Sequence, residues 1–177
     1  MQGEDVKMIK CFSCGALVPN IDGPTHEYML SAPGCWKLYG EILAKEYSLQ
    51  NYDPIAHRIT VDTYAVQHPG IKEGRTINSV NFHLIRLYLI FEKNLEVAKA
   101  NSIMKKISED EILHKKFEWL DPPSFENTLN IADVTKADDV DDHKKIVRQW
   151  GSSVWKAWKE KYGSYVETLI INAGYIK

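Results

Sequence analysis

Hydrophobic residues recur every three to four positions along most of this chain, a spacing that predicts amphipathic helices. The segment after the Ser-Ala-Pro-Gly sequence at 31–34 follows this spacing, and we expect a helix over 33–48. An Asp-Pro pair at 53–54 marks a second helix start, and we expect this helix to run to about residue 68. Its β-branched residues would also suit a strand, but its start and its length favour a helix.

The most hydrophobic segment, 75–94, is expected to form a central helix. Its apolar residues cover nearly every direction around a helix axis, and such a helix belongs in the interior. His83 and Arg86 lie one turn apart within it. Because buried polar groups need partners, we expect other polar side chains to contact them.

Strand signals are nearly absent from the sequence. Residues 8–30 are rich in Gly, Pro, Asn and Asp and are expected to be irregular, and 129–134 suits at most a short extended piece. The predicted fold is an all-α bundle of five to seven helices. We expect 1–177 to be a single domain, with an irregular knuckle-like segment, 8–35, packed on a helical bundle, 36–177. The remaining helices are predicted over 95–107, 109–118, 138–160 and 163–172.

Composition limits the partners and the compartment. The 177 residues are 44% hydrophobic, which is enough for a core, and the net charge of -2 provides no basic field for nucleic acid. The longest apolar run, 84–91, is far shorter than the ~20 residues of a membrane span, and residues 1–10 do not resemble a signal peptide. We therefore expect a cytoplasmic protein that binds neither a membrane nor nucleic acid. A homodimer through Tyr162, Tyr165 and Tyr175 stays open.

The three cysteines carry the clearest chemical signal. Cys11 and Cys14 form a C-x2-C turn, and Cys35 follows. An odd number of cysteines argues against a disulfide framework, and a redox dithiol is disfavoured because no βαβ pattern accompanies the turn. With His26 the pattern becomes C-x2-C-x11-H-x8-C, a ligand set that suits tetrahedral Zn2+. We expect a structural zinc ion with His26 as its fourth ligand and His68 as the alternative.

Polar residues outside this pattern are candidates for catalysis. His57 and His68 share one predicted helix but lie ~16 Å apart along its axis, so they cannot bind one metal ion. Asp62 is expected to pair with Arg58 one turn away. His143, from another helix, is a candidate to approach His83. The candidate catalytic residues are His57, Asp62, His68, His83, Arg86 and His143.

Five strings, CFSCGA, PTHEYM, PGCW, VDTYAVQHPG and SVNFHL, together resemble an uncharacterised bacterial family known only as a domain of unknown function. The resemblance covers about residues 11–160. It implies a small bacterial cytosolic protein and no known activity. It also implies that these residues belong to family motifs: Cys11, Cys14, His26, Cys35, His57, Asp62, His68, His83 and His143.

A weaker likeness is to the DinB-type helical bundles, metal-dependent thiol transferases that use three histidines. The string SVNFHLIRL is similar to their first histidine motif, but their second motif, H-x3-H, is missing. Two functions therefore stay open. The first is a zinc-stabilised binding or regulatory module, and the alternative is a metal-dependent hydrolase or transferase with a pocket around His83. Whether His83 lines a water-filled pocket or is packed dry would discriminate between them.

Overall fold

The computed structural model describes residues 7–48, 50 and 52–177, so residues 1–6 of the segment compared with a signal peptide lie outside it. Over the described residues the chain is mostly helical, as expected, with seven helices and a small sheet of two strands. The elements are β1 (Met8–Lys10), β2 (Leu17–Pro19), α1 (Pro33–Tyr47), α2 (Pro54–Gln67), α3 (Gly74–Phe91), α4 (Val97–Ser108), α5 (Glu111–His114), α6 (Ile131–Val134) and α7 (Val140–Asn172).

The first helices begin where the sequence predicts. Pro33 occupies the first turn of α1, where its missing N–H costs nothing. Asp53 caps α2, because its carboxylate accepts hydrogen bonds from the backbone N–H groups of Ile55 at 2.8 Å and Ala56 at 3.2 Å. The helix ends at Gln67, and the N–H of the next residue, His68, donates to the carbonyl of Tyr64.

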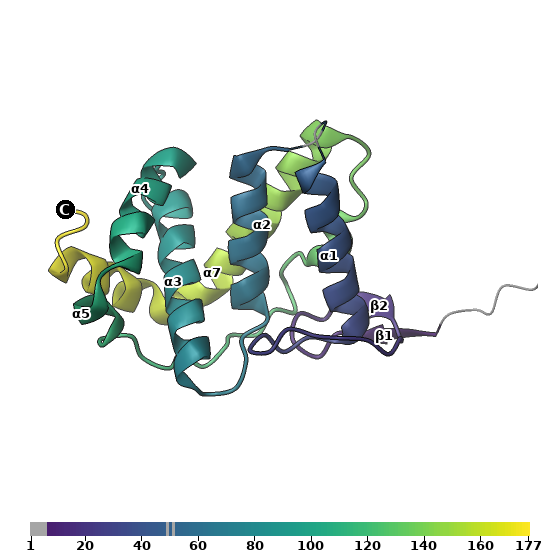
Figure 1. Cartoon of the computed structure of the whole chain (residues 1–177), viewed down its shortest axis with the longest axis horizontal. Coiled ribbons are helices and arrows are strands. Elements are labelled where there is room, and N and C mark those ends of the chain that lie inside the picture. Colours follow the sequence, from purple (N-terminus) through teal and green to yellow (C-terminus); the bar gives the residue numbers. More distant parts are fainter. Residues whose placement is uncertain (1–6, 49, 51) are drawn as a thin grey trace, which may run out of the picture.

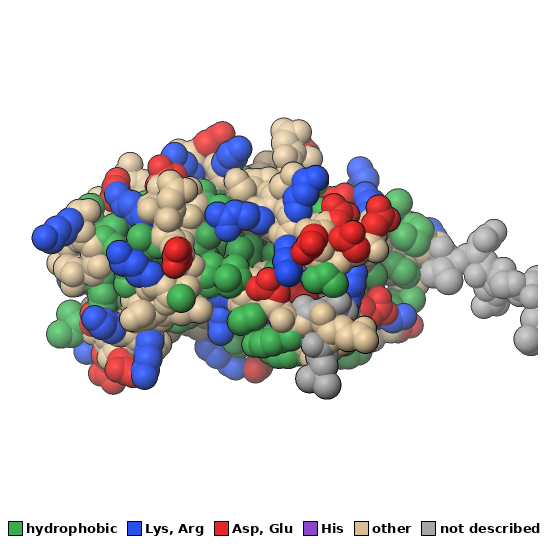
Figure 2. Space-filling model, turned by 90° about the horizontal axis from the view of Figure 1, so that it is seen from above, with side chains coloured by type: hydrophobic (Ala, Val, Ile, Leu, Met, Phe, Trp, Pro, Cys, Tyr) green, Lys and Arg blue, Asp and Glu red, His purple; other side chains and the backbone are tan. Residues whose placement is uncertain are grey.

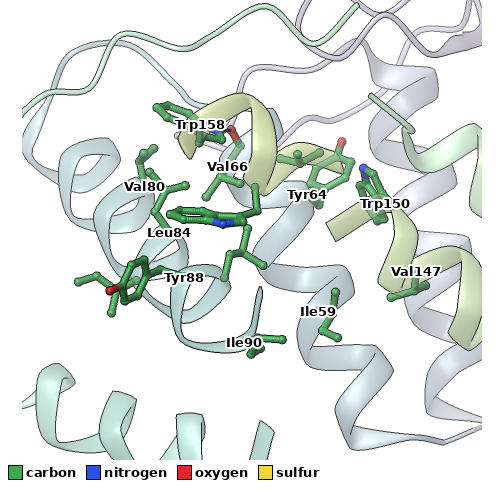
Figure 3. Packing of buried hydrophobic residues seen from close by; sticks show 14 of the residues in the cluster. Ile59, Tyr64, Val66, Val80, Leu84, Tyr88, Ile90, Val147, Trp150 and Trp158 are labelled. Atoms are coloured by element: carbon green, nitrogen blue, oxygen red, sulfur yellow. Dashed lines mark hydrogen bonds between the residues drawn. The ribbon is translucent and has the colours of Figure 1, made fainter. Parts of the chain in front are cut away.

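The core lies where α2, α3 and α7 pack together, and these three helices make the most extensive contacts of the fold. Figure 3 shows apolar and aromatic side chains from all three helices meeting there. The central position predicted for the segment 75–94 is thus confirmed, since the side chains of Leu84, Ile85 and Leu87 are fully buried. In Figure 1, helices α1 to α4 stand beside one another and α7 crosses behind them.

The last two predicted helices, 138–160 and 163–172, are one helix in the structure. α7 runs unbroken through 33 residues, about 50 Å, although Gly163 lowers its intrinsic helix propensity. The buried stripe continues through this point, with Trp158 before it and Val166 and Ile170 after it. Tertiary packing along the whole length therefore outweighs the local preference for a break.

The N-terminal segment corrects the all-α prediction. β1 and β2 form an antiparallel hairpin in which Ile9 lies opposite Val18, and Figure 1 places this hairpin at the foot of α1.

Two further predictions of secondary structure, for 129–134 and 109–118, were wrong in detail. The segment 129–134 contains the helix α6, which a capping box between Asn130 and Asp133 stabilises. The predicted helix 109–118 is reduced to the four residues of α5.

The surface carries both signs of charge. On the face seen in Figure 2, Lys and Arg side chains are interspersed with Asp and Glu, and no histidine is visible. The three tyrosines considered for a homodimer have their hydroxyl groups in hydrogen bonds within the chain, for example between Tyr165 and Asn81 at 2.7 Å. Among the described residues, no helix combines the length and hydropathy that a bilayer crossing requires.

Candidate metal centre

Three thiols and one imidazole converge where the hairpin meets α1 and the end of α2. The ligand atoms of Cys11, Cys14, Cys35 and His68 all lie within 4.8 Å of one another, and all four residues are buried. Cys35 Sγ lies 3.8 Å from Cys14 Sγ and 3.4 Å from His68 Nε2. Around tetrahedral zinc, ordinary bond lengths place two sulfurs about 3.8 Å apart and a sulfur and a nitrogen about 3.5 Å apart. These two distances therefore fit a tetrahedral ion.

A tight turn between the two strands brings Cys11 and Cys14 together. The N–H of Cys11 donates to the carbonyl of Ala16, and the N–H of Gly15 donates to the carbonyl of Cys11, both at 2.8 Å. Gly15 has φ +74°, a left-handed backbone conformation that residues other than glycine rarely adopt. The N–H of Ala32 lies 3.5 Å from Cys11 Sγ, so the backbone also stabilises this sulfur.

Close packing of the hairpin on α1 places Cys35. A Cβ on Gly34 would lie 2.2 Å from the carbonyl oxygen of Pro19, so only glycine allows β2 to approach the helix this closely. Cys35 follows in the first turn of α1 and is completely buried. The hydroxyl of Tyr64, from α2, lies 3.6 Å from Cys35 Sγ and donates a weak hydrogen bond to it. The third thiol is thus held by the start of one helix and contacted by another.

His68 presents one defined nitrogen to the cluster. Its Nδ1 lies 2.8 Å from the backbone carbonyl of Tyr64, which can only accept, so Nδ1 carries the proton. Nε2 is then the unprotonated nitrogen that faces Cys35 Sγ. The imidazole also stacks on the Tyr64 ring, with centroids 3.9 Å apart. This arrangement, in which the second nitrogen is fixed by a backbone carbonyl, is the usual one for a metal-ligating histidine.

Mutual hydrogen bonding makes the three thiols unequal in acidity. Hydrogen bonds from Cys14 and Cys35 lower the pKa of Cys11. The contact with Cys11 raises the pKa of Cys14 to about 12, and contacts with Cys11 and Cys14 raise the pKa of Cys35. Close contact among the three sulfurs therefore opposes the ionisation of all three at once unless a cation is present. A bound dication would displace the protons of the other two thiols, because thiolates are the form that binds metal.

His26, the first candidate for the fourth ligand, lies outside this cluster, and the alternative, His68, completes it. The imidazole of His26 packs edge-on against Tyr28 and Trp36, with centroids 4.3 Å and 5.3 Å away. Its Nδ1 accepts a hydrogen bond from the N–H of Tyr28 at 3.3 Å. Met29, which follows His26 in the chain, pairs with Pro69 just after the end of α2. The segment that carries His26 therefore runs beside this helix end, and His68 faces the thiols.

A buried carboxylate that the sequence analysis missed, Glu46, occupies a second polar cluster. His57 Nδ1 lies 2.9 Å from one of its oxygens, while Thr60 Oγ1 at 2.6 Å and His143 Nε2 at 2.9 Å contact the other. The expectation that His143 would approach His83 was therefore wrong. Glu46 lies inside the helix predicted over 33–48, and only its contacts with His57 of α2 and His143 of α7 show that it points inward.

Asp62 lies in a third polar cluster, and its predicted pairing with Arg58 was wrong. Its fully buried carboxylate faces α3, where His83 Nδ1 lies 2.6 Å away and Arg86 Nη1 lies 3.0 and 3.2 Å from the two oxygens. Burial lowers the pKa of Arg86, and the negative charge of Asp62 opposes this effect. The expectation that His83 and Arg86 have polar partners is confirmed.

The candidate histidines are thus divided among three clusters. His68 joins the thiols, His57 and His143 join Glu46, and His83 joins Asp62. Across the part of the chain that the structure describes, only the cluster of Cys11, Cys14, Cys35 and His68 has the spacing of a metal site. The three-histidine arrangement of a DinB-like site is therefore not formed by these residues.

Comparison with known proteins adds one match. A family model, described as a family of unknown function (DUF5946), matches residues 9–159. No curated protein and no solved structure matches the chain. The matched span includes Cys11, Cys14, Cys35 and His68, as well as the clusters around Glu46 and Asp62. The chain therefore belongs to this family of unknown function.

Proposed function

We propose that this chain is a zinc-binding helical protein in which the zinc ion is structural, and that it acts as a binding or regulatory module. The observation that carries the proposal is the buried set of Cys11, Cys14, Cys35 and His68 at metal-ligand spacing. Three soft thiolates and an imidazole in tetrahedral geometry favour zinc over the hard cations, which prefer oxygen ligands.

The structural role follows from the number and the origin of the ligands. Four protein ligands fill a tetrahedral shell, whereas catalytic zinc keeps one position open for water or substrate. The ligands come from the hairpin turn, the start of α1 and the end of α2, so one ion would join three segments. Zinc sites of this kind contribute about 10 kcal/mol or more of folding free energy at neutral pH.

A groove beside the centre supports the binding role. It has a volume of about 790 Å³, and its lining includes Cys11, Phe12 and Ser13 of the hairpin turn together with Pro123 and Phe125. Phe12 stands at the turn with 70% of its surface exposed. An aromatic side chain held outward by a rigid turn is a common contact residue at interfaces.

Metal analysis of the purified protein tests the proposal directly. We expect one zinc ion per chain, and we expect Co2+ substitution to give the absorption bands of a tetrahedral thiolate complex. A matched pair of variants locates the imidazole ligand. His68→Asn should lose most of the bound zinc and lower the thermal midpoint, whereas His26→Asn should keep zinc stoichiometry at the wild-type level.

Two outcomes would contradict the structural-zinc proposal. One is a wild-type protein that is metal-free yet has the same thermal midpoint with and without added zinc. The other is zinc loss in His26→Asn but not in His68→Asn, which would place the fourth ligand elsewhere. Cys14→Ser gives an independent check, because it removes a thiolate without reducing the size of the side chain appreciably.

A further inference from the structure

His83 lines a pocket that the candidate metal centre does not use. The pocket has a volume of about 350 Å³ and lies between α3, the segment around α5 and the loop that carries Tyr28. The side chain of His83 is 19% exposed, so this histidine is not packed dry. A pocket of this size suits a small ligand.

Asp62 fixes the orientation of the His83 imidazole. Its carboxylate is fully buried and accepts a hydrogen bond from His83 Nδ1 at 2.6 Å. Since Nδ1 is directed at the carboxylate, Nε2 is the nitrogen left for the pocket. Arg86 Nη1 donates to both oxygens of the same carboxylate, at 3.0 and 3.2 Å, and balances its charge. The imidazole is therefore preorganised to share a proton with a ligand through Nε2.

The other charged and polar groups of the pocket favour an anion. Arg75 lines the pocket, and its acidic partner among the described residues is Glu27. The two form a solvent-exposed ion pair, an interaction that is weak and open to competition. His114 also lines the pocket, and its buried Nε2 has no hydrogen-bond partner within the described part of the chain. No Asp or Glu is among the described residues that line it.

The apolar walls are aromatic. Tyr28, Phe82 and Phe117 all line the pocket. The Phe82 ring packs edge-on against His83, with centroids 5.8 Å apart, and the His114 ring lies 5.1 Å from that of Phe117. A planar ring of a ligand would therefore meet aromatic faces and edges beside the two imidazoles, which is a favourable environment for it.

We propose that this pocket binds the phosphate monoester of a small aromatic molecule, with the phosphate between His83 Nε2 and Arg75 and the ring against Phe82 and Phe117. A phosphate monoester is favoured over a carboxylate because its three terminal oxygens can accept hydrogen bonds from His83 Nε2 and from the Arg75 guanidinium at the same time. The proposal does not depend on the zinc ion.

Titration of the full-length protein with phenyl phosphate tests this site. Imidazole signals in 1H–15N spectra should shift in a saturable way, and the signal lost in His83→Gln should be among them. His83→Gln and Arg75→Gln should each weaken binding at least tenfold. Lys145→Gln removes a positive charge from the exposed face of α7 outside the pocket and should leave the affinity unchanged.

Two further probes separate the parts of the ligand. Inorganic phosphate lacks the ring and benzyl alcohol lacks the charge, and each should bind at least tenfold more weakly than phenyl phosphate. The proposal is overturned if wild-type protein shows no saturable shift, if Arg75→Gln binds like wild type, or if inorganic phosphate binds equally well. Arg75 is 60% exposed, so its variant stays informative even where His83→Gln impairs folding.

Discussion

The indole Nε1–H of Trp150 donates a hydrogen bond of 2.9 Å to the side-chain oxygen of Gln67. The amide nitrogen of Gln67 donates in turn to the hydroxyl of Thr128 and to the carbonyl of Leu129, both at 2.9 Å. A single buried side chain therefore joins α2, α7 and the connection between α5 and α6. Gln67 is the residue directly before His68. Its hydrogen bonds therefore stabilise the end of α2, which presents the His68 imidazole to the thiols.

Truncation of the Gln67 side chain should destabilise the folded protein. Gln67→Ala leaves the Trp150 indole and the Leu129 carbonyl without partners, and we expect a loss of about 3 kcal/mol in the free energy of unfolding, measured by urea denaturation. Gln149→Ala, at an exposed glutamine on α7, is the matched control and should stay within about 0.5 kcal/mol of wild type. Equal effects of the two substitutions would contradict the role assigned to Gln67.

Two glycines of α7 should respond to alanine with opposite signs. A Cβ at Gly151 would lie 2.8 Å from Ile59 Cγ2 and 2.9 Å from the Phe91 ring, whereas a Cβ at Gly163 would meet only the flexible Lys159 side chain. Gly151→Ala should therefore lower stability by about 1–2 kcal/mol despite its better helix propensity. Gly163→Ala should raise stability by up to about 1 kcal/mol.

Thermal or chemical unfolding of the two glycine variants provides the measurement. If Gly151→Ala also stabilises the protein, then α7 does not pack against α2 and the end of α3 as closely as described. If Gly163→Ala destabilises it, the continuous helix through this position is in doubt.

Glu46 should contribute far more to the free energy of unfolding than Glu41, an exposed residue on the same helix. Glu46→Ala removes the shared acceptor of His57, Thr60 and His143, and leaving these buried groups unpaired should cost about 3 kcal/mol or more. Glu41→Ala removes only an exposed partner of Lys37 and should cost less than about 1 kcal/mol. Denaturant unfolding of both variants at pH 7 distinguishes the two cases.

Glu92 should contribute stability that disappears in acid. The hydrogen bond from Lys159 lowers the pKa of Glu92, so the folded state favours its charged form. Such stability is present above the usual glutamate pKa, about 4.3, and is lost as the pH falls through the lower folded-state value. The difference in unfolding free energy between wild type and Glu92→Gln should be below about 1 kcal/mol at pH 7.

Unfolding curves recorded between pH 7 and pH 3 test whether the stability contributed by Glu92 is lost in acid. The difference between wild type and Glu92→Gln should shrink toward zero on acidification. Added salt should reduce it at pH 7, because the pair is partly exposed. A difference that grows as the pH falls would show that Glu92 is not stabilised in its charged form.

Local signals in the sequence were sufficient to predict most helices. The Asp-Pro start of α2 and the apolar content of α3 are properties of short segments, and both gave the correct element. The break predicted near Gly163 failed because a helix is also held by what packs along it, and the buried stripe around Trp158 and Val166 is a tertiary feature.

The sites were harder to predict than the fold. Spacing alone grouped the three cysteines, but it favoured His26 over His68 because proximity in sequence was the only measure available. The arrangement of β1, β2 and the end of α2 decides which imidazole faces the thiols. Glu46 and the Asp62–His83 contact depend on how helices face each other, and no short motif encodes that.

The position of the candidate metal ligands in the chain also bears on the order of synthesis. All four precede α3, whereas α7, which covers α2, comes last among the helices. A nascent chain therefore exposes its complete ligand set to the cell before the partner helix of α2 has left the ribosome. A metal ion bound during translation would dock the hairpin on α1 early, whereas a metal ion that arrives later would meet ligands already buried in the folded protein.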